Sequence, residues 1–114
     1  MNKKITFRGM EQSTAIENFI HEQLAKVEEF LSNENTPIHI DVVLKPSKIR
    51  AHHDVEIRVK SPNYDRISNY EGTDFYHTIT RVIDVMYKEL LEDKKKRVDS
   101  RKWTGRKDDF KKER

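Results

Sequence analysis

The strongest constraint on the fold of this chain is residues 71–97, where the apolar pattern of a helix gives way to a run of cations. Apolar side chains recur there every three or four positions, the spacing of one helix face. They are Ile79, Val82, Ile83, Met86 and Leu90. Asp74 follows a Gly-Thr pair at the position expected of an N-cap, and the segment ends with four cations. We therefore predict a helix over residues 74–95 with one buried face and a positive end.

A second amphipathic helix is predicted earlier, over Thr14–Leu31. Its apolar residues also keep helical spacing: Ile16, Ile20, Leu24, Val27 and Leu31. Thr14 and Glu17 have the spacing of a T-x-x-E capping box, which predicts a helix start at this point.

Period-two patterns predict strands between and before the helices. Residues 38–45 and 54–60 alternate apolar and polar side chains, and a polar connection between them predicts an antiparallel hairpin. Residues 4–8 predict a short first strand. Residues 64–71 are a weaker strand candidate because their apolar members do not keep period two.

The predicted order is β-α-β-β-β-α, an α+β fold in which two helices pack on one face of a four-stranded sheet. The other face of the sheet is expected to be polar and open. We predict one domain over residues 1–96, followed by a basic, disordered tail over residues 97–114, where apolar residues are too sparse to form a core.

Composition narrows the possible functions. With 34% apolar and 38% charged residues, the chain predicts a small core under a heavily ionised surface. The net charge is only +3, but residues 94–107 carry eight basic residues and one acid, 8 − 1 = +7, which favours a nucleic acid or another polyanion as partner. The chain has no cysteine and no apolar run of membrane-spanning length, so we expect a cytoplasmic protein with no membrane partner.

The chain lacks the motifs expected of an enzyme or a metal site. It contains no Gly-rich phosphate loop and no H-E-x-x-H motif. His52 and His53 are adjacent in a predicted strand and therefore point to opposite faces, which disfavours a shared metal ion. We expect no enzymatic activity, no metal, no cofactor and no small-molecule substrate.

Basic side chains on the predicted helices are the candidate polyanion-binding residues. The main candidates are Lys26, Arg81, Lys88, Lys94, Lys95 and Lys96. If the helices pack side by side, Lys26 and the end of the second helix form a basic strip for a phosphate backbone. The weaker candidates lie at the predicted hairpin connection and in the tail: Lys45, Lys48, Arg50, Arg97, Arg101, Lys102 and the aromatic Trp103, whose ring is suited to stacking on exposed bases. The alternative interpretation of residues 94–97 is a simple complement to the helix dipole.

The second predicted helix resembles a known protein family. The motif D-F-Y-x-x-I-x-x-V-I-D from Asp74 to Asp84 is similar to that of the ribosome hibernation promoting factors. This family includes ribosome-associated inhibitor A and was formerly called the sigma-54 modulation proteins. Supporting matches are Ile5-Thr6, residues 24–28 and the segment from Asp54 to residues 61–63. The similarity covers roughly residues 4–96.

The resemblance implies a function on the ribosome. Members of this family bind the small ribosomal subunit between its head and body, at the messenger and transfer RNA sites, within the intact ribosome. They stop translation and store ribosomes under stress and in stationary phase. The resemblance implies that Lys26, Lys88 and residues 94–96 meet ribosomal RNA phosphates. Val85 departs from the family pattern, which has a lysine there, and Arg81 one turn earlier is a candidate substitute.

Other interpretations stay open at this point. The length of 114 residues suggests a short form, and the tail from Arg97 has eight basic and four acidic residues, 8 − 4 = +4, unlike the acidic extension of the inhibitor A type. Whether ribosomes are paired is left open. The alternatives are a general double-stranded RNA-binding module, whose family begins with a helix rather than a strand, and an adaptor that acts on a transcription factor.

Overall fold

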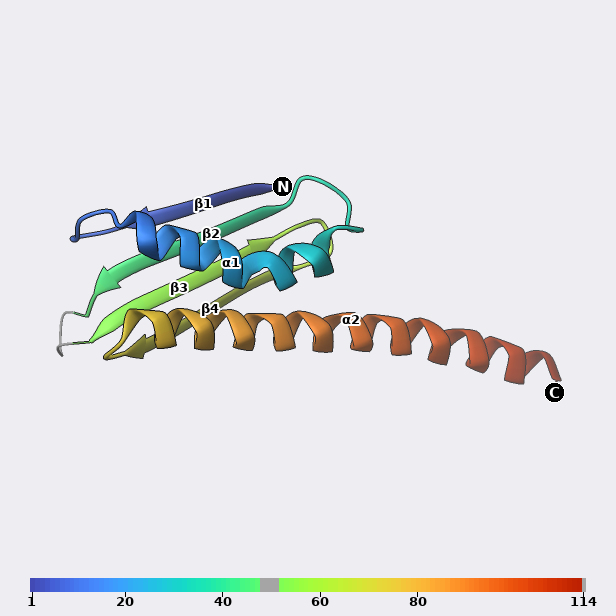
Figure 1. Cartoon of the computed structure of the whole chain (residues 1–114). Helices are drawn as coiled ribbons and strands as arrows, with labels where there is room; N and C mark the ends of the chain where they lie inside the picture. The colour runs from blue at the N-terminus through green and yellow to red at the C-terminus, as the bar shows by residue number, and fades with distance from the viewer. Residues whose placement is uncertain (48–51, 114) are drawn as a thin grey trace.

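The computed structural model describes residues 1–47 and 52–113, and it describes the backbone alone beyond residue 98. The elements follow the predicted order. They are β1 (Asn2–Phe7), α1 (Thr14–Leu31), β2 (His39–Pro46), β3 (His53–Lys60), β4 (Asp65–Gly72) and α2 (Phe75–Glu113). The α+β fold predicted from the sequence is confirmed (Figure 1).

The four strands form one mixed sheet in the order β1-β2-β3-β4. β1 pairs with β2 in parallel, with Ile5 opposite Val42, and α1 is the crossover that a parallel pair requires. β2, β3 and β4 pair antiparallel, with Leu44 opposite Val55, as the hairpin pattern predicts. Both helices cover the same face of the sheet and lie side by side (Figure 1).

The core lies between this face and the helices. Ile57 of the sheet is fully buried, as are Ile20 and Leu24 of α1 and Ile83 and Leu90 of α2. Alternate residues of β2 and β3 point into this core, which explains the period-two pattern of both segments. The hydrophobic effect of burying these two stripes therefore fixes the position of both helices on the sheet.

The opposite sheet face is largely polar, and its apolar residues include Val43 of β2 and Ile67 of β4. Asp41, Glu56 and Arg58 face this side because their strand neighbours are buried. Ile67 of β4 is also on this side and is 55% exposed. The apolar residues of β4 are thus divided between faces, which is why its sequence shows no clean alternation.

The sequence predicted the N-cap of α2 correctly and the N-cap of α1 incorrectly. Asp74 caps α2 as predicted: its carboxylate accepts from the Tyr76 amide at 3.1 Å. The predicted Thr14 capping box of α1 is wrong, because Ser13 is the N-cap and its hydroxyl accepts from the Ile16 amide at 3.3 Å. Thr14 is the first residue of the helix, so its side chain does not cap the free backbone amides of the first turn.

The end of α2 also differs from the expectation. The loss of apolar spacing after Leu90 predicted an end near Lys95, which is wrong, because the helix continues to Glu113 and runs past the sheet (Figure 1). The last proline of the chain is Pro62, and lysine, arginine and glutamate are good helix formers, so no residue stops the helix at residue 95. The predicted division after residue 96, with a disordered tail beyond it, stays a prediction.

Candidate nucleic-acid interface

The contact between α1 and α2 forms a seam that contains the first predicted cation. Lys26 of α1 makes an ion pair and hydrogen bond with Asp84 of α2. Its ammonium also lies 5.5 Å from the centre of the Tyr87 ring, within the range of a cation–π contact. The Lys26 side chain is 38% exposed. It is therefore held in place while part of it faces solvent.

Aromatic rings continue the same seam toward the end of α1. Phe30 packs edge-on against Tyr87, with ring centres 6.3 Å apart. The Lys94 ammonium lies 5.5 Å from the centre of the Phe30 ring. Two cations from different helices, Lys26 and Lys94, thus border one pair of rings, which is the juxtaposition that a basic strip between the helices requires.

The remaining main candidates are all on α2 and are not part of the contacts just described. Lys88, Lys95 and Lys96 are exposed on α2. Successive helical residues point about 100° apart, so residues 94, 95 and 96 project in three directions rather than forming a single row. Arg81 lies over the ring of Tyr70 on β4, with 5.3 Å between guanidinium and ring centre. Arg81 is therefore on the β4 side of α2, away from Lys26.

Arg97 is engaged within the fold. Its Nη2 donates to the Tyr64 hydroxyl at 3.0 Å and lies 3.9 Å from a carboxylate oxygen of Glu34. The guanidinium also lies over the Tyr64 ring at 5.0 Å. Burial raises the pKa of the Tyr64 phenol, and the Arg97 charge opposes that rise. These contacts join α2 to the segment before β4. Arg97 therefore stabilises the fold in addition to any role at the surface.

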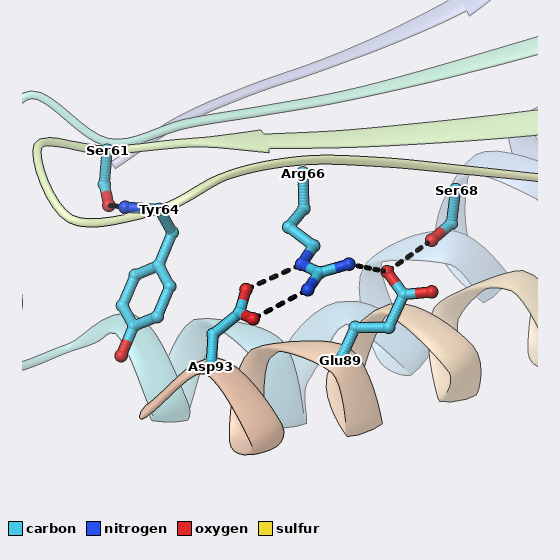
Figure 2. Close-up of polar contacts among 6 residues, drawn as sticks. All are labelled: Ser61, Tyr64, Arg66, Ser68, Glu89 and Asp93. Atoms are coloured by element: carbon cyan, nitrogen blue, oxygen red, sulfur yellow. Dashed lines mark hydrogen bonds and ion pairs between the residues drawn. The ribbon is translucent and has the colours of Figure 1, made fainter. Parts of the chain in front are cut away.

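A second arginine, Arg66 of β4, forms the strongest polar link between the sheet and α2 (Figure 2). Its Nε and Nη2 donate to the two carboxylate oxygens of Asp93 at 2.6 and 2.7 Å, and Nη1 donates to Glu89 at 3.3 Å. The Ser68 hydroxyl donates to the same Glu89 oxygen at 3.3 Å. The hydrogen bonds from Arg66 lower the pKa of Asp93, and Asp93 in turn raises the pKa of Arg66. We call Arg66, Glu89 and Asp93 the β4–α2 clamp.

Sequence reasoning missed this clamp, although a signal for it is present. Glu89 and Asp93 are four residues apart, so they share one side of α2. That side is adjacent to the buried stripe of Met86 and Leu90. A pair of acids at the border of a core predicts a cation on the facing strand, and Arg66 is that cation.

The weaker candidates are distributed differently. Lys45 is exposed at the end of β2, on the open sheet face, with its ammonium 3.9 Å from Asp54. Lys48 and Arg50 lie outside the described residues. The backbone at positions 101–103, which hold Arg101, Lys102 and Trp103, belongs to α2, while their side chains lie outside the described part. The RNA contacts predicted for all of these residues stay predictions.

Two further results concern metal ions and membranes. In the described part of the chain, no group of three or more His, Asp or Glu side chains is placed to hold a metal ion. Within that same part, neither helix has a stretch long and apolar enough to cross a membrane.

The fold and the exposed helices define a small α+β domain that presents cations from two packed helices. The sequence matches the model of one protein family over residues 4–98, described as Sigma 54 modulation protein / S30EA ribosomal protein. The chain belongs to this family. The family consists of ribosome-binding modulation proteins rather than enzymes, and the chain is accordingly a ribosome-associated protein of translational regulation.

Solved structures share the fold. The N-terminal domain of protein Y from Thermus thermophilus is 24% identical, with a TM-score of 0.66 over 79% of this chain and 96% of that one. A ribosomal subunit interface protein from Coxiella burnetii is 19% identical, with a TM-score of 0.64 over 82% of this chain and 98% of that one. No curated protein matches this chain.

Proposed function

We propose that this protein is a ribosome hibernation factor that binds the small ribosomal subunit at the messenger and transfer RNA sites. It blocks translation there and keeps ribosomes in an inactive, stored state. It acts in the cytoplasm on ribosomal RNA, without catalysis, cofactor or small-molecule substrate. The observation that carries this proposal is the family match over residues 4–98.

The surface chemistry supports RNA as the ligand. Lys26 and Lys94 border the helix seam, and Lys88 and Lys95 are exposed on the same helical layer. Cations that neutralise phosphates release counterions, so this layer is suited to a phosphate backbone. Such contacts position the protein on RNA without reading its base sequence.

The test is co-sedimentation of the purified protein with ribosomes and isolated subunits through sucrose gradients at low and high salt. We expect co-migration with the small subunit and the intact ribosome, loss of binding at high salt, and lower translation in a reconstituted assay. A new peak of paired ribosomes would add ribosome dimerisation to the function. Absence from every ribosomal peak at low salt would overturn the proposal.

A charge-reversal variant localises the interface. Lys94→Glu/Lys95→Glu changes two exposed cations of α2 and leaves Lys96, whose charge helps lower the pKa of Asp93 in the β4–α2 clamp. The matched control is Lys4→Glu/Lys60→Glu, two exposed lysines of the sheet with the same change in charge. We expect the first pair to abolish subunit binding and the control to retain it. Equal loss in both variants would indicate a general charge effect rather than this interface.

Two alternatives make different predictions in the same assays. A general double-stranded RNA-binding module binds any free duplex as tightly as it binds ribosomes. The N-terminal β1 strand, parallel to β2, argues against that fold, which begins with a helix. An adaptor for a transcription factor would bind through apolar contacts, and its affinity would change little with salt.

A further inference from the structure

A concavity of about 330 Å³ lies where β1 and β2 end, at the end of the sheet from which α2 starts. Arg8, Gly9, Lys45 and Pro46 line it. The structure describes a second shallow concavity, between Pro37 and Pro62, but only one lysine lines it. The first is distinguished by two cations in its wall.

The Arg8 backbone is fixed by the sheet. Its amide donates to the Leu44 carbonyl at 2.8 Å, which continues the pairing of β1 with β2 by one residue. Gly9 then turns the chain with a φ of 65°, a conformation that favours glycine. A cation on a fixed backbone is a better binding group than one on a free loop, because less ordering is needed when the ligand arrives.

The charges of both cations are available to a ligand. Among the described residues, Arg8 makes no ion pair and its side chain is exposed. The Lys45 ammonium is 3.9 Å from Asp54, at the limit of an ion pair, and Lys45 is 48% exposed. Asp54 itself is only 13% exposed and accepts a hydrogen bond from Asn69. The acid is thus mostly covered, while both cations face solvent.

This concavity is far from the basic end of α2 at Lys94 and Lys95, and it is on a different side of the molecule. Lys45 alternates with the buried Leu44 and therefore belongs to the open sheet face, whereas Lys94 and Lys95 belong to the helical layer. The concavity is at the starting end of α2, where His53, paired with Pro46, stacks on Phe75. From residue 75 to residue 95 the helix rises about 30 Å. The two cationic sites therefore lie near different ends of α2 and on different faces of the domain.

We propose that the concavity formed by Arg8, Gly9, Lys45 and Pro46 is a second phosphate-binding site for ribosomal RNA, so that the domain bridges two separate RNA segments. This inference rests on the proposed function. Its ligand is a phosphodiester of the RNA backbone, bound by the Arg8 guanidinium and the Lys45 ammonium. Contacts on two sides of the domain favour folded RNA over an isolated duplex, which meets only one side.

The test compares Arg8→Gln/Lys45→Gln with Lys4→Gln/Lys60→Gln, which removes the same charge from exposed lysines elsewhere on the sheet. Affinity for small subunits is measured at several salt concentrations. We expect Arg8→Gln/Lys45→Gln to bind at least about fivefold more weakly than the control. Its log-affinity against log-salt slope should be lower by about 0.7–0.9, the value for one lost phosphate contact.

The outcomes separate the two proposals. If the wild-type protein binds, and the Arg8→Gln/Lys45→Gln variant has the same affinity and salt slope as the control, the second site alone is overturned. Failure of the wild-type protein to bind overturns both. Far-UV circular dichroism checks that each variant retains the wild-type fold.

A second experiment is independent of these variants. The chain has no cysteine, so Glu11→Cys and Glu92→Cys each introduce a single attachment point for an iron chelate. Glu11 is exposed two residues after Gly9, and Glu92 is exposed on α2. We expect hydroxyl radicals from the two positions to cleave two different ribosomal RNA segments. Cleavage from position 92 with none from position 11 overturns the second site.

Discussion

Replacing Arg66 with glutamine should measurably loosen α2 from the sheet. Arg66→Gln removes the charge and the bidentate contact with Asp93 but keeps a polar, shorter side chain. The change leaves Glu89 and Asp93 as two neighbouring acids without their cation, four residues apart on one helix side. The β4–α2 clamp is therefore lost as a unit.

The magnitude follows from the geometry and from solvent exposure. Hydrogen bonds to charged groups contribute about 1.5–3 kcal/mol each when they are well shielded, whereas exposed ion pairs contribute about 0.2–1 kcal/mol. The Arg66 and Asp93 side chains are 36% and 26% exposed, so screening by water reduces the contribution of the clamp. We expect a loss of about 1–2 kcal/mol in the free energy of unfolding, or a melting temperature lower by about 5–15 °C.

The pH dependence provides a second signature. The pKa of Asp93 in the folded protein is below its usual value of 3.8, because Arg66 stabilises the carboxylate. The clamp therefore stabilises the fold above about pH 4, and this stabilisation is lost as the pH falls through the folded pKa. In Arg66→Gln the pKa of Asp93 rises toward its ordinary value. The difference in stability between variant and wild type should shrink on acidification.

The assay is equilibrium urea unfolding followed by far-UV circular dichroism, at neutral pH and at about pH 3. The control is Arg58→Gln on the open sheet face. Arg58 forms an ion pair with Asp65 at 3.3 Å, and these side chains are 43% and 56% exposed, so we expect a loss below about 0.5 kcal/mol. Equal losses in the two variants, or a loss in Arg66→Gln that does not change with pH, would refute the reasoning.

Three further predictions concern the core, the turn before α2 and the end of the chain. Leu90→Ala truncates a fully buried side chain and should cost about 2–5 kcal/mol in urea unfolding; a cost below about 1 kcal/mol would contradict its central place in the core. Gly72→Ala places a methyl group against the Thr78 hydroxyl, which donates to the Asp74 carbonyl at 2.7 Å, and should cost about 1–3 kcal/mol by thermal melting. An unchanged melting temperature would contradict this prediction, because it would mean that the Thr78 side chain moves aside with no loss of stability. Deleting residues 99–114 should leave the urea midpoint unchanged, since the last buried apolar residue of the described part is Leu90; a clear fall would show that the tail belongs to the domain.

Local patterns in the sequence determined most of the fold. α1 spans the residues predicted for it, β2 and β3 match their alternating segments, and Asp74 caps α2. Each of these features depends on residues within a few positions of one another, so their periodicity is readable without the partner element. The failures are also local: Ser13 and Thr14 are both good caps, and the sequence does not distinguish between them.

The candidate site depends on contacts between distant residues. The sequence indicated which cations face solvent on the helices, but the partners of those cations were decided by packing. Lys26 meets Asp84 58 positions away, and Arg97 meets Tyr64 33 positions away. No local pattern reports such distances.

The sequence by itself determined the order of elements, the buried faces and the family, because these depend on short-range periodicity and on a contiguous motif. Tertiary structure alone decided that Arg66 faces α2 rather than solvent, and that Arg8 and Lys45 share one concavity. The physical reason is that a charge acts over a few ångströms in space whatever its separation along the chain. Which cations are paired and which face solvent is therefore settled only when helices and strands are packed together.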